Sequence, residues 1–139
     1  MKEKVKKKEK VNKNERVEMN EKGILIFTGK KDKELDHRHL VHVEADDHTM
    51  FVSSKYQPEI KKVFVLSHLE KLLPEDMYMR THKAHLVNLS CVVADTMKAF
   101  GNKGLLVNLK YTKRQAIVSE RKVPIFLEKL EAYKQGNCE

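Results

Sequence analysis

The sequence predicts a mostly β fold with one short helix in the middle of the chain and one helix at its C-terminal end. Two observations support this class. Many short runs of β-favouring residues are separated by turn residues, whereas only the final segment repeats apolar residues at helical spacing. With 139 residues, the chain can form one domain around a modest core and carry a tail.

Residues 1–22 are expected to form a flexible or weakly helical basic arm, and residues 23–139 the globular domain. The arm holds nine basic and five acidic residues, a net charge of +4 (9 − 5), and its few apolar residues are widely spaced. Such a segment buries too little apolar surface to order itself. It is either a solvated tail or a non-specific contact to nucleic-acid phosphates.

Short extended runs follow from Gly23 onward. Strands are expected at residues 24–28, 40–45, 50–53, 62–66, 77–80, 85–89, 91–94, 105–109 and 116–119. In the second run, alternation places Val41, Val43 and Ala45 on one face, and the Asp-Asp pair that follows suggests a hairpin to the next run. The glycine-flanked tetrapeptide 101–104 is a second hairpin connection.

Two helices are predicted. Ser67 and Glu70 have the spacing of a capping box, and Pro74 would stop the short helix that they begin. Near the C-terminus, four apolar residues recur at helical spacing: Val123, Phe126, Leu127 and Leu130. Gly136 would end this second helix.

The charge of the chain favours a polyanionic partner. Lys and Arg number 28 against 20 Asp and Glu, which gives a net charge of +8 and an isoelectric point near 9.4. A merely soluble, lysine-rich surface would have the same charge. No apolar run approaches membrane-helix length and no secretory signal is evident, so a cytoplasmic protein is expected.

Catalysis, cofactors and metals are not expected. The sequence has no glycine-rich phosphate loop, no activated Ser or Cys signature and no evident carboxylate pair. Cys91 and Cys138 fit neither a zinc-ligand spacing nor a disulfide framework. The pairs His82/His85 and His37/His39 are weak metal-ligand patterns because no cysteine or positioned carboxylate set accompanies them.

Three segments in order resemble the LytTR family of bacterial transcription regulators. They are LVHVEADDHTMFV (40–52), MYMRTHKAHLVNLSCVV (77–93) and AIVSERKVPIFLEKL (116–130), and the likeness extends over about residues 24–133. The resemblance implies an elongated stack of small antiparallel β-sheets that reads double-stranded DNA through loops. Neither a receiver domain nor a membrane span precedes the match, so the chain resembles a stand-alone, response-regulator-like member. Family members often bind paired direct-repeat half-sites, so a dimer on DNA is expected.

The resemblance places DNA contacts in three loops, at residues 46–49, 80–85 and 119–122. Arg121 is the first candidate for a base contact, because a guanidinium can donate twice to guanine. Lys83 would meet a base or a phosphate, and the first loop would contribute either His48 or Thr49.

The remaining candidates are Arg80, His82 and Lys122. Alternation puts Arg80 and His82 on the same side of an extended chain. Arg80 could instead hold its loop through an acidic neighbour such as Glu44. Otherwise Arg80, together with Lys98, Lys103, Lys122 and the basic arm, is expected to contact phosphates.

Two other functions remain open from the sequence. A single-stranded nucleic-acid binder would need a platform of exposed aromatic residues, but most phenylalanines lie in apolar patterns typical of a core. A protein-interaction module would use exposed strand edges or the final helix, and its binding would be insensitive to salt.

Overall fold

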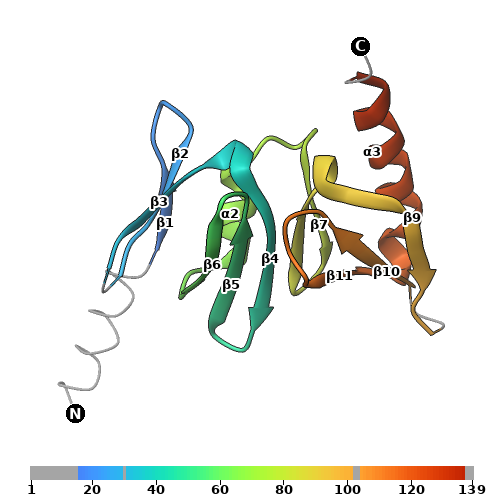
Figure 1. Ribbon diagram of the computed structural model, residues 1–139, viewed down its shortest axis with the longest axis horizontal. Helices are drawn as coiled ribbons and strands as arrows, with labels where there is room; N and C mark the ends of the chain where they lie inside the picture. The colour runs from blue at the N-terminus through green and yellow to red at the C-terminus, as the bar shows by residue number, and fades with distance from the viewer. Residues whose placement is uncertain (1–15, 30, 102–103, 137–139) are drawn as a thin grey trace.

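Three antiparallel β-sheets follow one another along the longest dimension of the computed structural model, which describes residues 16–29, 31–101 and 104–136 (Figure 1). The strands are β1 Val17–Met19, β2 Ile24–Phe27, β3 Lys33–Asp36, β4 Leu40–Asp46, β5 Thr49–Ser54, β6 Gln57–Lys62, β7 Tyr78–His82, β8 His85–Asn88, β9 Val92–Ala99, β10 Gly104–Leu109 and β11 Gln115–Ser119. The first sheet has the order β1-β2-β3, the central sheet β6-β5-β4-β8-β7 and the third sheet β11-β10-β9.

Within the described residues, two α-helices and three 3-10 helices accompany the sheets. Helix α2 is Leu66–Leu72, α3 is Val123–Gly136, and the 3-10 helices are η1 His37–His39, η2 Leu89–Cys91 and η3 Glu120–Lys122. The predicted mostly β class, with one short mid-chain helix and one C-terminal helix, is thereby confirmed. No helix in the described ranges is long and apolar enough to cross a membrane.

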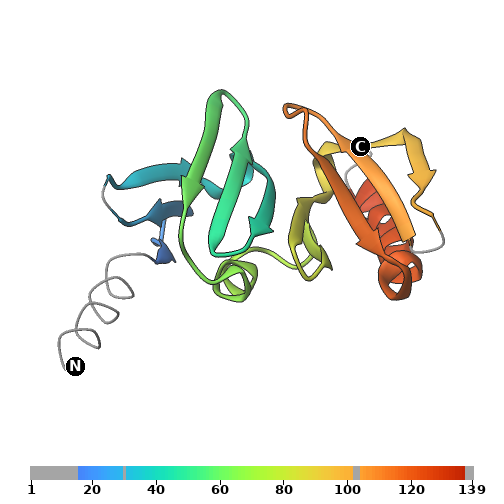
Figure 2. The same ribbon diagram turned by 90° about the horizontal axis from the view of Figure 1, so that it is seen from below.

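The central sheet is buried on both faces, and each face packs in a separate core (Figure 2). Successive residues of a strand point to opposite faces. In β8, Leu86 therefore enters the core shared with the first sheet and α2, whereas Val87 enters the core shared with the third sheet and α3. In β7, Tyr78 likewise packs in the first of these cores and Met79 in the second.

The start of β4 departs from the predicted alternation. The register between β4 and β5 shifts between Leu40 and His42. A bulge of this kind adds a residue and offsets the faces that follow. Val41 consequently packs in the second core and Val43 in the first, so the common face predicted for Val41, Val43 and Ala45 is wrong at Val41.

Helix α2 begins without the predicted capping box. Its N-cap is Val65, which makes no side-chain capping bond, and Ser67 lies inside the helix. The helix begins earlier because Leu66 and Leu69, three residues apart, are both buried in the first core. The strand predicted at 62–66 is also displaced, because β6 ends at Lys62.

The first sheet contains two strands that were not predicted. Strand β1 lies within the segment assigned to the basic arm, where Val17 is buried and pairs with Phe27. The first described strand therefore begins before the expected boundary at residue 22, while the prediction for residues 1–15 lies outside the described part. Strand β3 buries only Leu35, a single apolar residue among charged ones.

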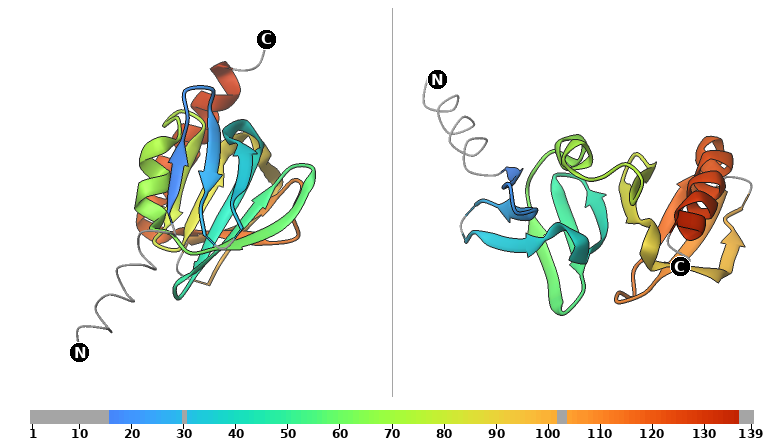
Figure 3. Two further views of the ribbon diagram at one scale, coloured as in Figure 1. Left: turned by 90° about the vertical axis from the view of Figure 1, so that its left-hand side faces the viewer. Right: turned by 90° about the horizontal axis from the view of Figure 1, so that it is seen from above.

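Helix α3 covers the third sheet (Figure 3). Its buried residues, Phe126 and Leu130, share the second core with Val107 of β10 and Val118 of β11. The helix is described as far as Gly136, where the described residues end, so the predicted stop at Gly136 stays a prediction.

Gly104, at the start of β10, packs too closely on β11 to accept a side chain. Its φ is +132°, and a Cβ there would lie 1.9 Å from the carbonyl oxygen of Val118. Gly104 pairs with Ser119, at the end of β11. This glycine therefore allows β10 to approach the segment that leads into η3.

We expect Gly104→Ala to lower the free energy of unfolding by about 3 kcal/mol, because it adds both a backbone clash and a strained φ. Urea denaturation monitored by circular dichroism measures the change. Gly136→Ala is the matched control, because a Cβ at Gly136 meets nothing within 4 Å. Equal midpoints for the two variants would contradict the close pairing of β10 and β11.

Candidate nucleic-acid interface

Two of the three predicted contact loops lie side by side at one end of the central sheet. Strands β4 and β8 are antiparallel, with Glu44 opposite His85. The backbone N–H of Ala45 donates to the carbonyl of Ala84 at 2.8 Å. The β4–β5 turn and the β7–β8 turn therefore project together, toward the lower side of Figure 1.

The β4–β5 turn exposes His48. Its side chain is 90% exposed, and Nε2 lies 3.8 Å from the Asp47 carboxylate. Asp47 adopts a positive φ of 61°, a conformation that Asp tolerates in tight turns. Thr49 is half-buried at the start of β5, so His48 is the more accessible of the two alternatives.

The second and third predicted loops meet in one depression, which we call the basic hollow. It is lined by Glu70, Arg80, His82, Lys83, Ser119, Arg121 and Lys122. All five candidates of the 80–85 and 119–122 loops therefore share one surface: Arg80, His82, Lys83, Arg121 and Lys122. His48 and Thr49 do not line it, and Lys98 is exposed on β9.

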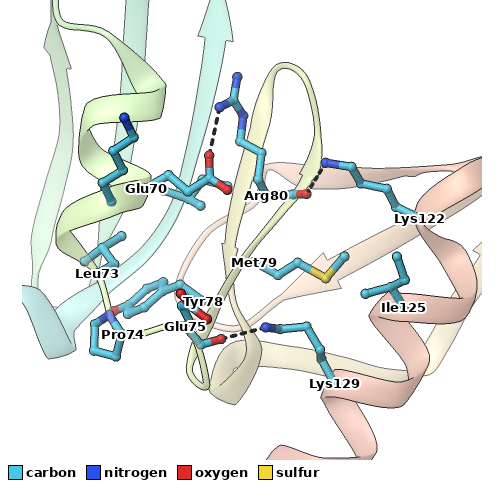
Figure 4. A pocket seen from close by; sticks show the side chains of 12 residues that line it. Glu70, Leu73, Pro74, Glu75, Tyr78, Met79, Arg80, Lys122, Ile125 and Lys129 are labelled. Carbon is cyan, nitrogen blue, oxygen red and sulfur yellow. Dashed lines mark hydrogen bonds and ion pairs between the residues drawn. The ribbon is translucent and has the colours of Figure 1, made fainter.

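Arg80 is held by neighbouring residues. Its guanidinium donates to the Glu70 carboxylate at 3.2 Å and to the carbonyl of Lys83 at 2.6 Å (Figure 4). Only 21% of its side chain is exposed, and Nε is buried without a hydrogen-bond partner among the residues that the structure describes. The acidic neighbour is therefore Glu70 of α2, whereas Glu44 pairs with Arg114.

Lys122 links η3 to the central sheet. Its Nζ donates to the carbonyl of Arg80 at 2.9 Å, and about two helical turns later Lys129 donates to the carbonyl of Glu75 at 2.8 Å (Figure 4). These bonds cross a pocket whose lining includes Met79 and Ile125. They fix the beginning of α3, and with it Arg121, against β7.

His82 presents a donor in the hollow. Its Nδ1 accepts the backbone N–H of Ala84 at 3.0 Å. Partial burial, together with the positive charges of Lys83, Lys122 and Arg80, lowers its pKa. The neutral ring therefore carries its proton on Nε2.

Arg121 and Lys83 differ from Arg80 because their side chains are exposed. Within the described part of the chain, neither side chain has a hydrogen-bond or ion-pair partner. Their charges are available to an incoming ligand, and Lys103 lies outside the described residues.

The histidine pair of η1 does not assemble a metal site. His37 contacts the carbonyl of Gly23 at 2.9 Å, and the ring of His39 packs edge-on against Tyr56. Sequence reasoning missed a different histidine pair, His42 and His85, because 43 residues separate them. Nδ1 of His85 lies 3.0 Å from Nε2 of His42, and both rings are buried.

Comparison with known proteins supports one family. The family model for the LytTr DNA-binding domain matches residues 33–131, from β3 into α3. Among solved structures, the LytTr DNA-binding domain of a response regulator from Bacillus cereus is similar, with a TM-score of 0.62 and 19% sequence identity. The likeness covers 79% of this chain and 97% of that chain. No curated protein matches the chain.

The contrast between Arg80 and Arg121 can be tested by stability. We expect Arg80→Ala to lower the free energy of unfolding by about 1–3 kcal/mol, because it leaves Glu70 and the Lys83 carbonyl without their donor. Arg121→Ala should change it by less than about 0.5 kcal/mol, as is usual for exposed residues. Urea denaturation of both variants measures these changes. An equal loss of unfolding free energy in the two variants would contradict the distinction between a structural Arg80 and a free Arg121.

Proposed function

The chain belongs to the LytTR family of DNA-binding domains, which are non-catalytic domains of transcription regulation, and we propose that it binds double-stranded DNA sequence-specifically through loops in the major groove. The observation that carries this proposal is the basic hollow, where predicted contact residues from two separate loops share one surface. A site of this kind would act in a bacterial regulator, in the cytoplasm where the DNA lies.

Base contacts are assigned to the residues with free donors. Arg121 is exposed at η3 and can offer two parallel N–H groups to guanine O6 and N7. Lys83, in the β7–β8 turn, meets a base edge or a neighbouring phosphate. Nε2–H of His82 supplies one further donor between them.

The β4–β5 turn supplies a second contact. It lies beside the β7–β8 turn but outside the basic hollow. His48, or Thr49 next to it, would therefore reach a neighbouring segment of the groove rather than the same base pair. Contacts separated in this way read several positions along a duplex.

Phosphate contacts are assigned to the remaining basic residues. Arg80 and Lys122 are occupied by bonds within the protein, so they contribute their positive field and the shape of the hollow more than flexible contacts. Lys98, Lys103 and the basic arm would add sequence-independent attraction. Two protomers on paired direct-repeat half-sites would double the contacts.

A single-stranded nucleic acid is a weaker match to this surface. The most exposed aromatic residues, Tyr56 and Tyr111, pack against each other with ring centroids 6.3 Å apart. Tyr56 lies in the β5–β6 turn, at the opposite end of β5 from His48. These two rings therefore lie away from the basic hollow. Phe100 is partly exposed and lines a pocket with His82 and Arg121, but one ring does not make a stacking platform for successive bases.

The proposal is tested by selection from random duplexes, followed by binding titrations at two salt concentrations. We expect one repeated motif, and a slope of log K against log salt near −5 if about six phosphates are neutralised. Arg121→Ala should lose about 1–3 kcal/mol, mainly as lost sequence preference.

Arg38→Ala is the matched control, because Arg38 is an exposed arginine paired with Asp36 and lies just before β4, at the end of that strand remote from the contact turns. Its affinity should equal that of the wild type. If no motif emerges and single strands bind as well as duplexes, the proposed mode is wrong. Binding of a protein partner that does not respond to salt would instead indicate a protein-interaction module.

A further inference from the structure

Three side chains able to bind a metal ion converge where β4 and β8 pair. His42 and Glu44 are two residues apart on β4 and share a face, and His85 stands opposite Glu44 on β8. One potential ligand atom from each residue lies within 4.8 Å of the others. Adjacent, paired strands hold such a set more rigidly than loops would.

The two imidazoles already lie nearly at the spacing that a metal ion requires. Nε2 of His42 and Nδ1 of His85 are 3.0 Å apart, and the rings are stacked with an interplanar angle of 21°. Tetrahedral zinc with bonds of about 2.0–2.1 Å places its ligand nitrogens about 3.3 Å apart. A metal ion could take the place of the shared proton if the two nitrogens separate by a few tenths of an ångström, both rings turn so that their lone pairs converge on the ion, and the displaced proton moves to the outer nitrogen of its ring.

One ring nitrogen of this histidine pair has no hydrogen bond among the described residues. Nδ1 of His42 is buried and has no partner among the described residues. Buried polar atoms without partners are uncommon. A metal ion held by Nε2 would leave Nδ1 as the N–H of the same ring, so this atom marks an unusual buried imidazole rather than the ligand position itself.

The nearby charges permit a cation. Arg114 donates to both carboxylate oxygens of Glu59, at 2.5 and 3.1 Å, and makes one bond of 3.1 Å to Glu44. Glu59 therefore offsets part of the positive charge of Arg114 near the site. The Glu44 side chain is 30% exposed, which gives an ion a route from solvent.

We propose that His42, Glu44 and His85 form a binding site for one zinc-class divalent metal ion, with water as the fourth ligand. Two imidazoles and one carboxylate with an open position are a ligand set that zinc accepts. The ion would fasten β4 to β8 close to the turns that carry His48 and Lys83. This site is independent of the proposed DNA contacts.

The site is tested on the full chain after treatment with a chelator, with Zn²⁺ measured by calorimetry and Co²⁺ by its visible absorption. We expect one ion per chain and a tetrahedral cobalt spectrum without a sulfur-to-cobalt band. His85→Gln should abolish binding. Glu44→Gln should weaken it at least about tenfold, the lower end of the loss seen when even an outer-shell partner is removed.

His48→Gln is the matched control, because His48 lies on the exposed turn outside the proposed site, and it should leave metal affinity unchanged. If His85→Gln does not fold, Glu44→Gln decides, because it keeps an acceptor for Arg114. The proposal is overturned if the wild type binds no cobalt, if Glu44→Gln binds as tightly as the wild type, or if His48→Gln is equally impaired.

Discussion

Burial of both faces of the central sheet is the constraint on which the arrangement of the molecule depends. Every residue of β8 is buried, and its polar ends are satisfied internally. The amide nitrogen of Asn88 donates to the carbonyl of Leu40 at 2.8 Å, and its oxygen accepts the backbone N–H of Ser90. The sheet can thus separate two apolar cores without leaving these groups unpaired.

The third sheet is positioned by polar contacts as well as by the second core. The Thr81 hydroxyl donates to the carbonyl of Ile117 at 2.9 Å, which ties β7 to β11. Arg114, from the β10–β11 connection, lies over the ring of Phe51 and pairs with acidic residues of β4 and β6. These contacts determine where β11 ends, and therefore where Arg121 emerges relative to the β7–β8 turn.

Sequence patterns predicted the strands and the helix whose own residues show a clear apolar repeat. They failed for elements whose position depends on contacts with residues far away in the sequence. Strand β8 and helix α3 have enough apolar residues to be recognised locally. Strand β3 buries only Leu35, so its mostly charged sequence shows no apolar alternation from which a strand could be predicted. The Ser67 capping box was wrong because burial of Leu66 determined the start of α2. For the site, the resemblance indicated the loops, but no local signal could show that Arg80 pairs with Glu70 or that His42 meets His85.

The three arginines near the interface show why residue type alone does not assign a role. Arg80 and Arg114 are each bound by acidic side chains and shielded by packing, so their guanidinium groups maintain the scaffold. Arg121 follows the last strand, where η3 exposes it. A guanidinium offers the same donors in all three places, but only an unpaired one can exchange water for a base edge without breaking a contact that holds the fold. The scaffold thus limits which of the basic residues can contribute to sequence recognition.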